Sequence, residues 1–225
     1  MSIANRLREV TDSLPQGVRL VAVSKFHPAE YVKEAYDAGQ RVFGESREQE
    51  LSRKVEELPK DIEWHFIGHL QTNKVKYIAP YISMIDAVDS LKLLREINKQ
   101  AAAHGRTIKV LLELHIAEEE TKYGLSLDAC RELLEGGEWR ALQNVQICGL
   151  MMMASHVDDE SVIRKEFMLA ADFFDEVKAR YFADDDSFCE RSWGMTLSAV
   201  LQKILKMNPH LLFLILSPTP AQPKQ

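Results

Sequence analysis

The stretch Val18-Arg-Leu-Val-Ala-Val-Ser24 decides the fold. It is short, mostly apolar and rich in β-branched residues, which is typical of a parallel strand buried on both faces. A helix follows, because Pro28 suits a first helical turn and Gly39 suits a helix end. The residues expected to face inward from this helix are Val32, Ala35 and Tyr36. Arg41-Val-Phe-Gly44 is strand-like again, so the stretch predicts a strand–helix–strand unit.

The same alternation extends in both directions along the chain. Ile3, Leu7 and Val10 lie at helical spacing and predict a helix that ends near Pro15-Gln-Gly17. A helix rich in Glu and Arg follows Gly44. Further strands are expected at residues 63–68, 83–88, 108–116, 145–153, 188–193 and 211–215, and further helices at 90–105, 126–134, 159–181 and 197–206.

Eight strands that alternate with helices, without a linker, favour a single α/β domain of the (β/α)₈ TIM-barrel type. An open doubly wound sheet is the alternative, but no Gly-x-Gly-x-x-Gly turn follows any strand. We expect one barrel domain over residues 1–217 and a disordered tail over residues 218–225.

The composition excludes several classes of protein. The chain has 225 residues, 46% hydrophobic and 28% charged, which suits one globular domain. The net charge of −6 gives no electrostatic reason to expect nucleic acid or a membrane as partner. The longest apolar run, Leu211 to Leu216, is too short to span a bilayer, and the polar residues in the first ten positions argue against a signal peptide.

The cysteines and two histidines give no sign of a metal site. Cys130, Cys148 and Cys189 have neither metal-ligand nor redox spacing, so we expect reduced thiols in a cytoplasmic protein. His65 and His69 are four residues apart, but on a strand end and a loop rather than on one helix face. We therefore do not expect these histidines to bind zinc as a pair. We expect them to have a structural role in the wall of the pocket.

Lys25 ends the first predicted strand, and barrel enzymes carry their reactive residues at such positions. By spacing alone, the favoured interpretation is a lysine that extends out of the sheet to water. The alternative is a partly desolvated amine with a lowered pKa that forms a Schiff base. A phosphorylated aldehyde on that amine would need anion donors from loops or helix N-termini near the last strands.

The residues around Lys25 decide between the two interpretations. Val21-Ala-Val-Ser-Lys25, followed by Pro28, resembles the lysine motif of the pyridoxal 5′-phosphate (PLP) homeostasis proteins. The resemblance covers roughly residues 5 to 196. It continues in order through Gly44-Glu45, Trp64-His-Phe-Ile-Gly-His-Leu-Gln71, Asn73-Lys74, Val88-Asp89-Ser90, Glu120-Thr-Lys-Tyr-Gly124 and Gly149-Leu-Met151. The stretch that begins at Trp64 is highly specific.

The resemblance implies a barrel like the N-terminal domain of alanine racemase, with PLP held as a Schiff base on Lys25. It implies cofactor contacts from Ser46, Met151, Ser192, Met195 and Thr196, although the family usually has Asn where Ser46 stands and Asn where His115 stands. Such proteins are thought to buffer or deliver PLP without turnover, so the partners expected are PLP and apo PLP-dependent enzymes, and the expected state is a monomer.

Two other functions stay open. One is a racemase-like PLP enzyme. Racemisation needs proton transfer on both faces of the substrate carbon, and the second domain that supplies the racemase's opposing tyrosine is missing.

The other is a barrel with impaired PLP binding. After Thr196 the family continues with a Gly-Ser-Thr turn and a Val-Arg-Ile-Gly strand, whereas this chain has no Gly or Arg beyond Gly194. Family divergence or a shifted reading frame near codon 196 explains this, and loss of every motif residue at one point favours the frameshift.

Overall fold

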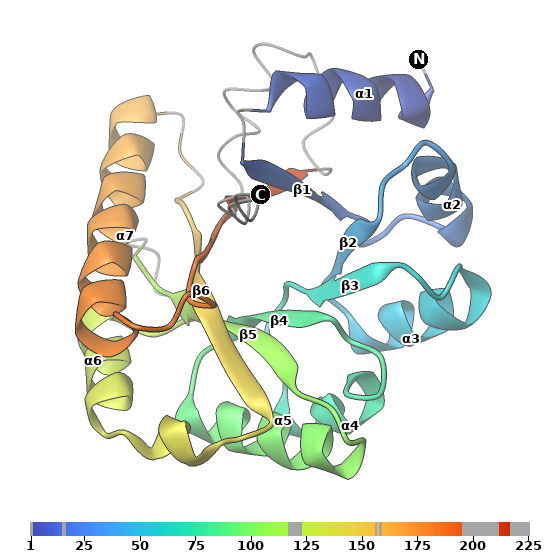
Figure 1. Cartoon of the computed structure of the whole chain (residues 1–225). Coiled ribbons are helices and arrows are strands. Elements are labelled where there is room, and N and C mark those ends of the chain that lie inside the picture. The colour runs from blue at the N-terminus through green and yellow to red at the C-terminus, as the bar shows by residue number, and fades with distance from the viewer. Residues whose placement is uncertain are drawn as a thin grey trace, which may run out of the picture.

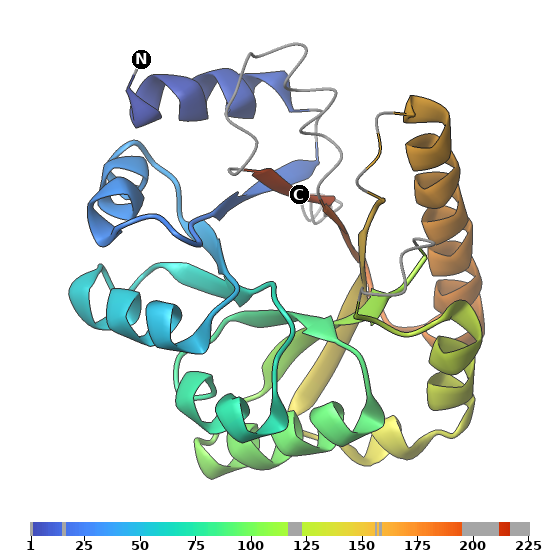
Figure 2. The ribbon, with the colours of Figure 1, turned by 180° about the vertical axis from the view of Figure 1, so that it is seen from behind.

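The computed structural model describes residues 2–14, 17–116, 123–155, 157, 159–194 and, as backbone, 212–216. Within them, eight strands form a closed barrel in the order β1 to β8, and the helices surround it (Figures 1 and 2). The predicted fold class is confirmed. None of the helices in this described part of the chain combines the length and hydropathy needed to cross a membrane.

The strands lie within about two residues of their predicted bounds. They are β1 Val18–Val23, β2 Val42–Glu45, β3 Glu63–Phe66, β4 Met84–Val88, β5 Ile108–Leu114, β6 Val145–Met153, β7 Glu190–Gly194 and β8 Leu212–Leu216. The agreement arises because most of these strands are largely apolar runs, and such runs are bounded by polar or glycine-containing turns.

The predicted helices within the described residues are present as well. They are α1 Ile3–Ser13, α2 Ala29–Asp37, α3 Glu48–Glu57, α5 Leu91–Ala103, α6 Leu127–Glu135 and α7 Glu160–Tyr181. Pro28 is the N-cap of α2 rather than part of its first turn, and Ser90 caps α5 by accepting a hydrogen bond from the Leu93 N–H.

Three short elements were not predicted, and two predicted segments lie outside the described residues. The sequence did not predict η1 Thr72–Lys74, α4 Val75–Ile78 or η2 Glu138–Ala141, because one helical turn shows no periodicity. The predicted helix 197–206 and the predicted tail 218–225 lie outside the described residues. The single domain over 1–217 therefore stays a prediction.

The eighth strand closes the barrel, but it runs in the opposite direction to the other seven. Strands β1 to β7 pair in parallel, whereas β8 is antiparallel to both β1 and β7. Phe213 pairs with Gly194, so the chain re-enters the sheet at the end where β7 leaves it. An antiparallel neighbour needs no crossover to the opposite end of the barrel. Pairing on both sides leaves neither β1 nor β7 with an open edge.

The strands are buried on both faces. Their outer sides join the helices in the main hydrophobic core, with Phe43, Trp64, Phe66, Leu112 and Leu150 among its members. Two smaller clusters fill the inside. Val21 and Val23 pack with Val42 and Ile67, and Met84, Leu111, Cys148 and Met151 form the other group. This two-sided burial explains why the strands read as nearly continuous apolar runs.

Gly149 lets β6 and β7 approach each other inside the barrel. A Cβ atom at Gly149 would lie 1.8 Å from the carbonyl oxygen of Glu190, so no other residue fits without moving the backbone. The close approach accompanies a shift of register between β5 and β6. Beyond it, Met151 lies directly opposite Ser192.

Candidate functional site

Lys25 lies at the carboxyl end of β1, in the mouth of the barrel. The Ser24 N–H donates to the Gly44 carbonyl over 2.9 Å, so the ladder between β1 and β2 continues to the residue before Lys25. Lys25 itself lies in the turn that follows β1, two residues after Val23, and Val21 and Val23 belong to an inner cluster. Its side chain is partly exposed. Lys25 thus follows an apolar strand and can be reached from solvent.

A second lysine, Lys54 on α3, lies buried beneath the Lys25 segment. Its side chain is only 1% exposed. The Nζ atom donates to the Ser24 carbonyl over 2.7 Å, to Glu50 Oε1 over 3.0 Å and to Glu45 Oε1. The Ser24 hydroxyl also donates to Glu45 Oε1, over 2.7 Å. Burial raises the pKa of Glu45, and the hydrogen bond from Lys54 opposes that rise. This buried network fixes the backbone before Lys25.

The residue after Lys25 is held in an unusual conformation. Phe26 has a φ of +65°, which is strained for a bulky side chain. Its N–H donates to Glu50 Oε1 over 2.9 Å, the same oxygen that accepts from Lys54. The Arg47 guanidinium lies 4.7 Å from the centre of the exposed Phe26 ring. The backbone on both sides of Lys25 is therefore bound to side chains of α3.

Three polar residues are enclosed inside the barrel. His65 Nδ1 lies 3.0 Å from Asp86 Oδ1, and the Ser192 hydroxyl donates to Asp86 Oδ2 over 3.5 Å. None of the three side chains exceeds 2% exposure. The predicted structural role of His65 agrees with this geometry. No group of three His, Cys, Asp or Glu side chains in the described ranges is arranged to hold a metal ion.

A cavity of about 210 Å³ opens at the mouth, beyond the ends of β3, β5 and β6. Its lining residues are Ile67, Gly68, His69, Glu113, Leu114, His115, Tyr123 and Met153. The His69 ring stacks on the exposed Tyr123 ring at a centroid distance of 3.8 Å, and His69 Nδ1 lies 3.2 Å from Asp89 Oδ2. Gly124, with a φ of +121°, lets the segment after Tyr123 lie against the end of β5.

Glu113 is the buried acid of this cavity. Its side chain is 8% exposed, and its Oε2 atom has no hydrogen-bond partner. Burial, with a smaller contribution from the negative charge of Asp89, raises the pKa of Glu113 to about 7. At neutral pH this carboxyl group is therefore near the midpoint of its titration.

The predicted site residues fall at two depths. Lys25 and Ser46 lie at the mouth. A Cβ atom at Gly68 would lie 2.7 Å from Ser46 Cβ, so the loop of Ser46 touches the loop of Gly68. Met151 and Ser192 are fully buried deeper inside. Met195 and Thr196 lie outside the described residues. The contacts of all six with a cofactor stay predictions.

Sequence reasoning missed Lys54 and Glu113. Lys54 occupies a position three residues after the buried Leu51 on α3 and four after Glu50, a spacing that signals a lysine on the inner face of the helix. Glu113 alternates with Leu111, which lies inside the barrel, so the strand period marks Glu113 as inward-facing.

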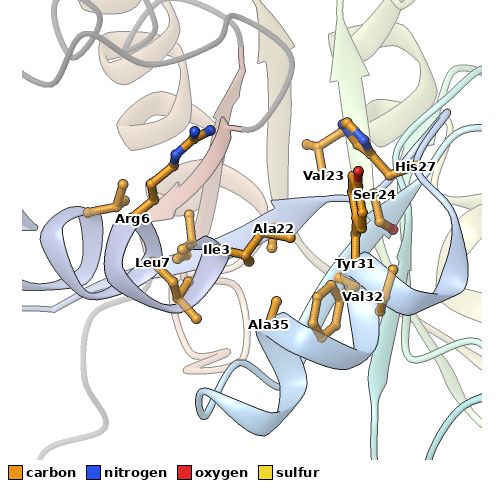
Figure 3. Close-up of a pocket in the computed structure, with 13 residues that line it drawn as sticks. Ile3, Arg6, Leu7, Ala22, Val23, Ser24, His27, Tyr31, Val32 and Ala35 are labelled. Carbon is orange, nitrogen blue, oxygen red and sulfur yellow. The ribbon is translucent and has the colours of Figure 1, made fainter. Parts of the chain in front are cut away.

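A second cavity, of about 170 Å³, lies between α1, β1 and α2 (Figure 3). Apolar side chains such as Leu7, Ala22 and Val32 line it, and Ala22 faces it from the helix side of β1. Lys25 is not among its lining residues. Val23, Ser24 and His27, which flank Lys25 in the chain, do line it.

Known proteins share both the sequence and the fold. Residues 1–200 match the family described as alanine racemase, N-terminal domain. The pyridoxal phosphate homeostasis protein of Aquifex aeolicus is 34% identical over 183 residues, which are 80% of this chain and 79% of that protein. The protein of the same name from Escherichia coli is 32% identical over 196 residues, 80% of this chain and 82% of that one.

Solved structures agree with these relatives. The structure of PipY from Synechococcus elongatus with PLP bound has a TM-score of 0.72 and 35% identity, over 80% of this chain and 84% of that chain. An alanine racemase from Clostridium difficile 630 has a TM-score of 0.69 at 13% identity, over 92% of this chain and 54% of that chain, and shows the fold alone. The chain therefore belongs to the family of pyridoxal phosphate homeostasis proteins, within the broader alanine racemase N-terminal domain family.

Proposed function

We propose that this chain binds PLP through the ε-amino group of Lys25 and acts as a carrier or buffer of PLP rather than as an enzyme. The observation that carries the proposal is the position of Lys25 at the barrel mouth, with the backbone on both sides of it held by α3. When bound, PLP supplies an electrophilic aldehyde, an aromatic ring and a phosphate dianion.

The described residues fit such a group. Lys25 offers the amine, and Ile67 and Met153 offer an apolar wall. Ser192 and Asp86 provide a buried polar floor. The residues expected to hold the phosphate, Met195 and Thr196, lie outside the described part, and their role is part of the proposal. The name of the relatives and the PLP bound in PipY support the assignment.

The finer parts of the proposal concern partners and activity. We infer that the recipients of PLP are apo PLP-dependent enzymes and that the protein acts as a monomer in the cytoplasm. The absence of turnover is inferred from the name of the relatives.

The test is chemical trapping. Borohydride reduction of the PLP-treated protein, followed by peptide mapping, is expected to leave a pyridoxyl group on Lys25. Lys25→Ala should abolish the label, whereas Lys33→Ala, which changes an exposed lysine on α2, should retain it. A label on Lys74 or Lys122 in place of Lys25 would overturn the proposal.

A further inference from the structure

Glu113 presents an unsatisfied carboxylate oxygen to the mouth cavity. Its side chain is more than nine-tenths buried, its Oε2 atom has no partner, and it lines a cavity of about 210 Å³. A buried carboxyl oxygen without a hydrogen bond is unfavourable by itself. An atom in this state, at the wall of a cavity with room for a small molecule, indicates a site for a ligand that donates hydrogen bonds.

The surroundings of Glu113 define the charge of that ligand. The negative charge of Asp89 is close enough to raise the pKa of Glu113. Asp89 itself pairs with His69, and His69 stacks on Tyr123. No basic side chain in the described ranges bonds to Glu113 Oε2. His115 is the second histidine of the lining. The buried, unpartnered oxygen of Glu113, with the negative charge of Asp89 nearby, favours a cation.

The lining decides which kind of cation fits. Ile67 and Met153 supply an apolar wall beside the acid. One carboxylate, aromatic and imidazole rings, and an aliphatic wall suit a primary ammonium group with a short carbon chain, because the compact head has three N–H donors.

We propose that this cavity binds the protonated amino group of a small primary amine or free amino acid, with Glu113 as its anchoring carboxylate. Two of the lining residues, Ile67 and Met153, also pack in the inner cluster that contains Val23, which lies two residues before Lys25. The role of the amine as an acceptor of PLP rests on the proposed function, but binding of the amine does not.

If PLP is held on Lys25, it would supply an electrophilic carbon at which one amine can replace another. In that exchange Glu113 would take the proton that the ammonium group must lose before its nitrogen can act as a nucleophile, and this proton would pass to the Lys25 amine on its release. The exchange needs no oxidant or reductant.

The binding test uses the full chain without PLP, and n-propylamine as the probe. Calorimetry or ligand-detected NMR is expected to show binding that strengthens from about pH 6 to pH 8, as Glu113 ionises through a pKa of about 7. Propanol, which has no charge, should not compete. Glu113→Gln should weaken binding about tenfold or more and remove its pH dependence.

The controls separate this inference from the proposed function. Glu138→Gln, which changes an exposed carboxylate on η2, should bind propylamine like the wild type. Equal affinity of the wild type and Glu113→Gln, no binding to the wild type at pH 8, or a flat pH profile of the wild type would overturn the inference. Propylamine binding in a chain that fails to take up PLP would refute the proposed function and leave the ammonium site standing.

Discussion

Replacement of Lys54 by methionine removes the charge that holds the Lys25 segment. Methionine keeps much of the length and apolar volume of lysine, so the change isolates the ammonium group. In the variant, the buried Glu45 loses the cation beside it, and the Ser24 carbonyl and Glu50 lose a donor. Glu45 is fully buried, so water does not replace the lost contacts.

The expected loss is large. Breaking a buried ion pair by removal of one partner destabilises a protein by about 3–5 kcal/mol. For a domain of this size, 1 kcal/mol shifts the melting temperature by about 2–4 °C. Lys54→Met should therefore lower the melting temperature by roughly 6–20 °C. The affinity for PLP should fall as well, because the Ser24 carbonyl, directly before Lys25, loses the donor that holds it.

Thermal and urea unfolding measure this loss of stability. They compare the wild type with Lys54→Met and with the double variant Glu45→Leu/Lys54→Met. The double variant removes both charges, so it should regain most of the lost stability. Lys33→Met is the matched control, because Lys33 forms an exposed pair with Asp37 on α2, and it should cost about 0.5 kcal/mol or less. A loss below about 1 kcal/mol for Lys54→Met would refute the reasoning.

Three further predictions concern Glu113, turnover and the reading frame. The folded-state pKa of Glu113, about 7, exceeds the ordinary value of 4.5, so its protonated form contributes stability that is full below about pH 4.5 and lost as the pH rises through 7. Between pH 5 and 8 the free energy of unfolding of the wild type should therefore fall by up to about 3 kcal/mol more than that of Glu113→Gln. Free energies of unfolding that change with pH in parallel in the two proteins would contradict this. Purified protein with PLP should not exchange the α-hydrogen of L-alanine in deuterium oxide, and rapid exchange would reveal an enzyme. In the nucleotide sequence, another frame from near codon 196 should encode Gly-Ser-Thr and Val-Arg-Ile-Gly, and the absence of such a frame would leave family divergence as the explanation.

Much of the fold was predictable because its signals are local. The run 18–24 and the five strands that follow it are mostly buried on both faces, so most of them appear in the sequence as largely apolar stretches. Helix ends are local as well, since the Ser90 and Ser126 side chains cap the helices that begin one residue later. The position of Lys25 at a strand end followed from the same pattern.

The direction of β8 was not predictable from its residues. Leu212–Leu216 is equally apolar in either orientation, and pairing with β1 and β7 determines which one forms. The conformation of Phe26 depends on Glu50, 24 residues away in the chain, which accepts from its N–H. The local sequence gives no sign of a φ of +65° at Phe26, because phenylalanine rarely adopts positive φ values.

By itself, the sequence determined the alternation of strands and helices, the barrel and the lysine at the end of β1, because each of these depends on residues close together in the chain. Only the tertiary structure decided that Lys54 is buried beneath Lys25 and that Glu113 carries an unsatisfied oxygen at the mouth. The physical reason is that burial and ionisation depend on which side chains surround a group, and those neighbours, such as Ser24 and Glu45 for Lys54 or Asp89 for Glu113, come from separate strands and loops.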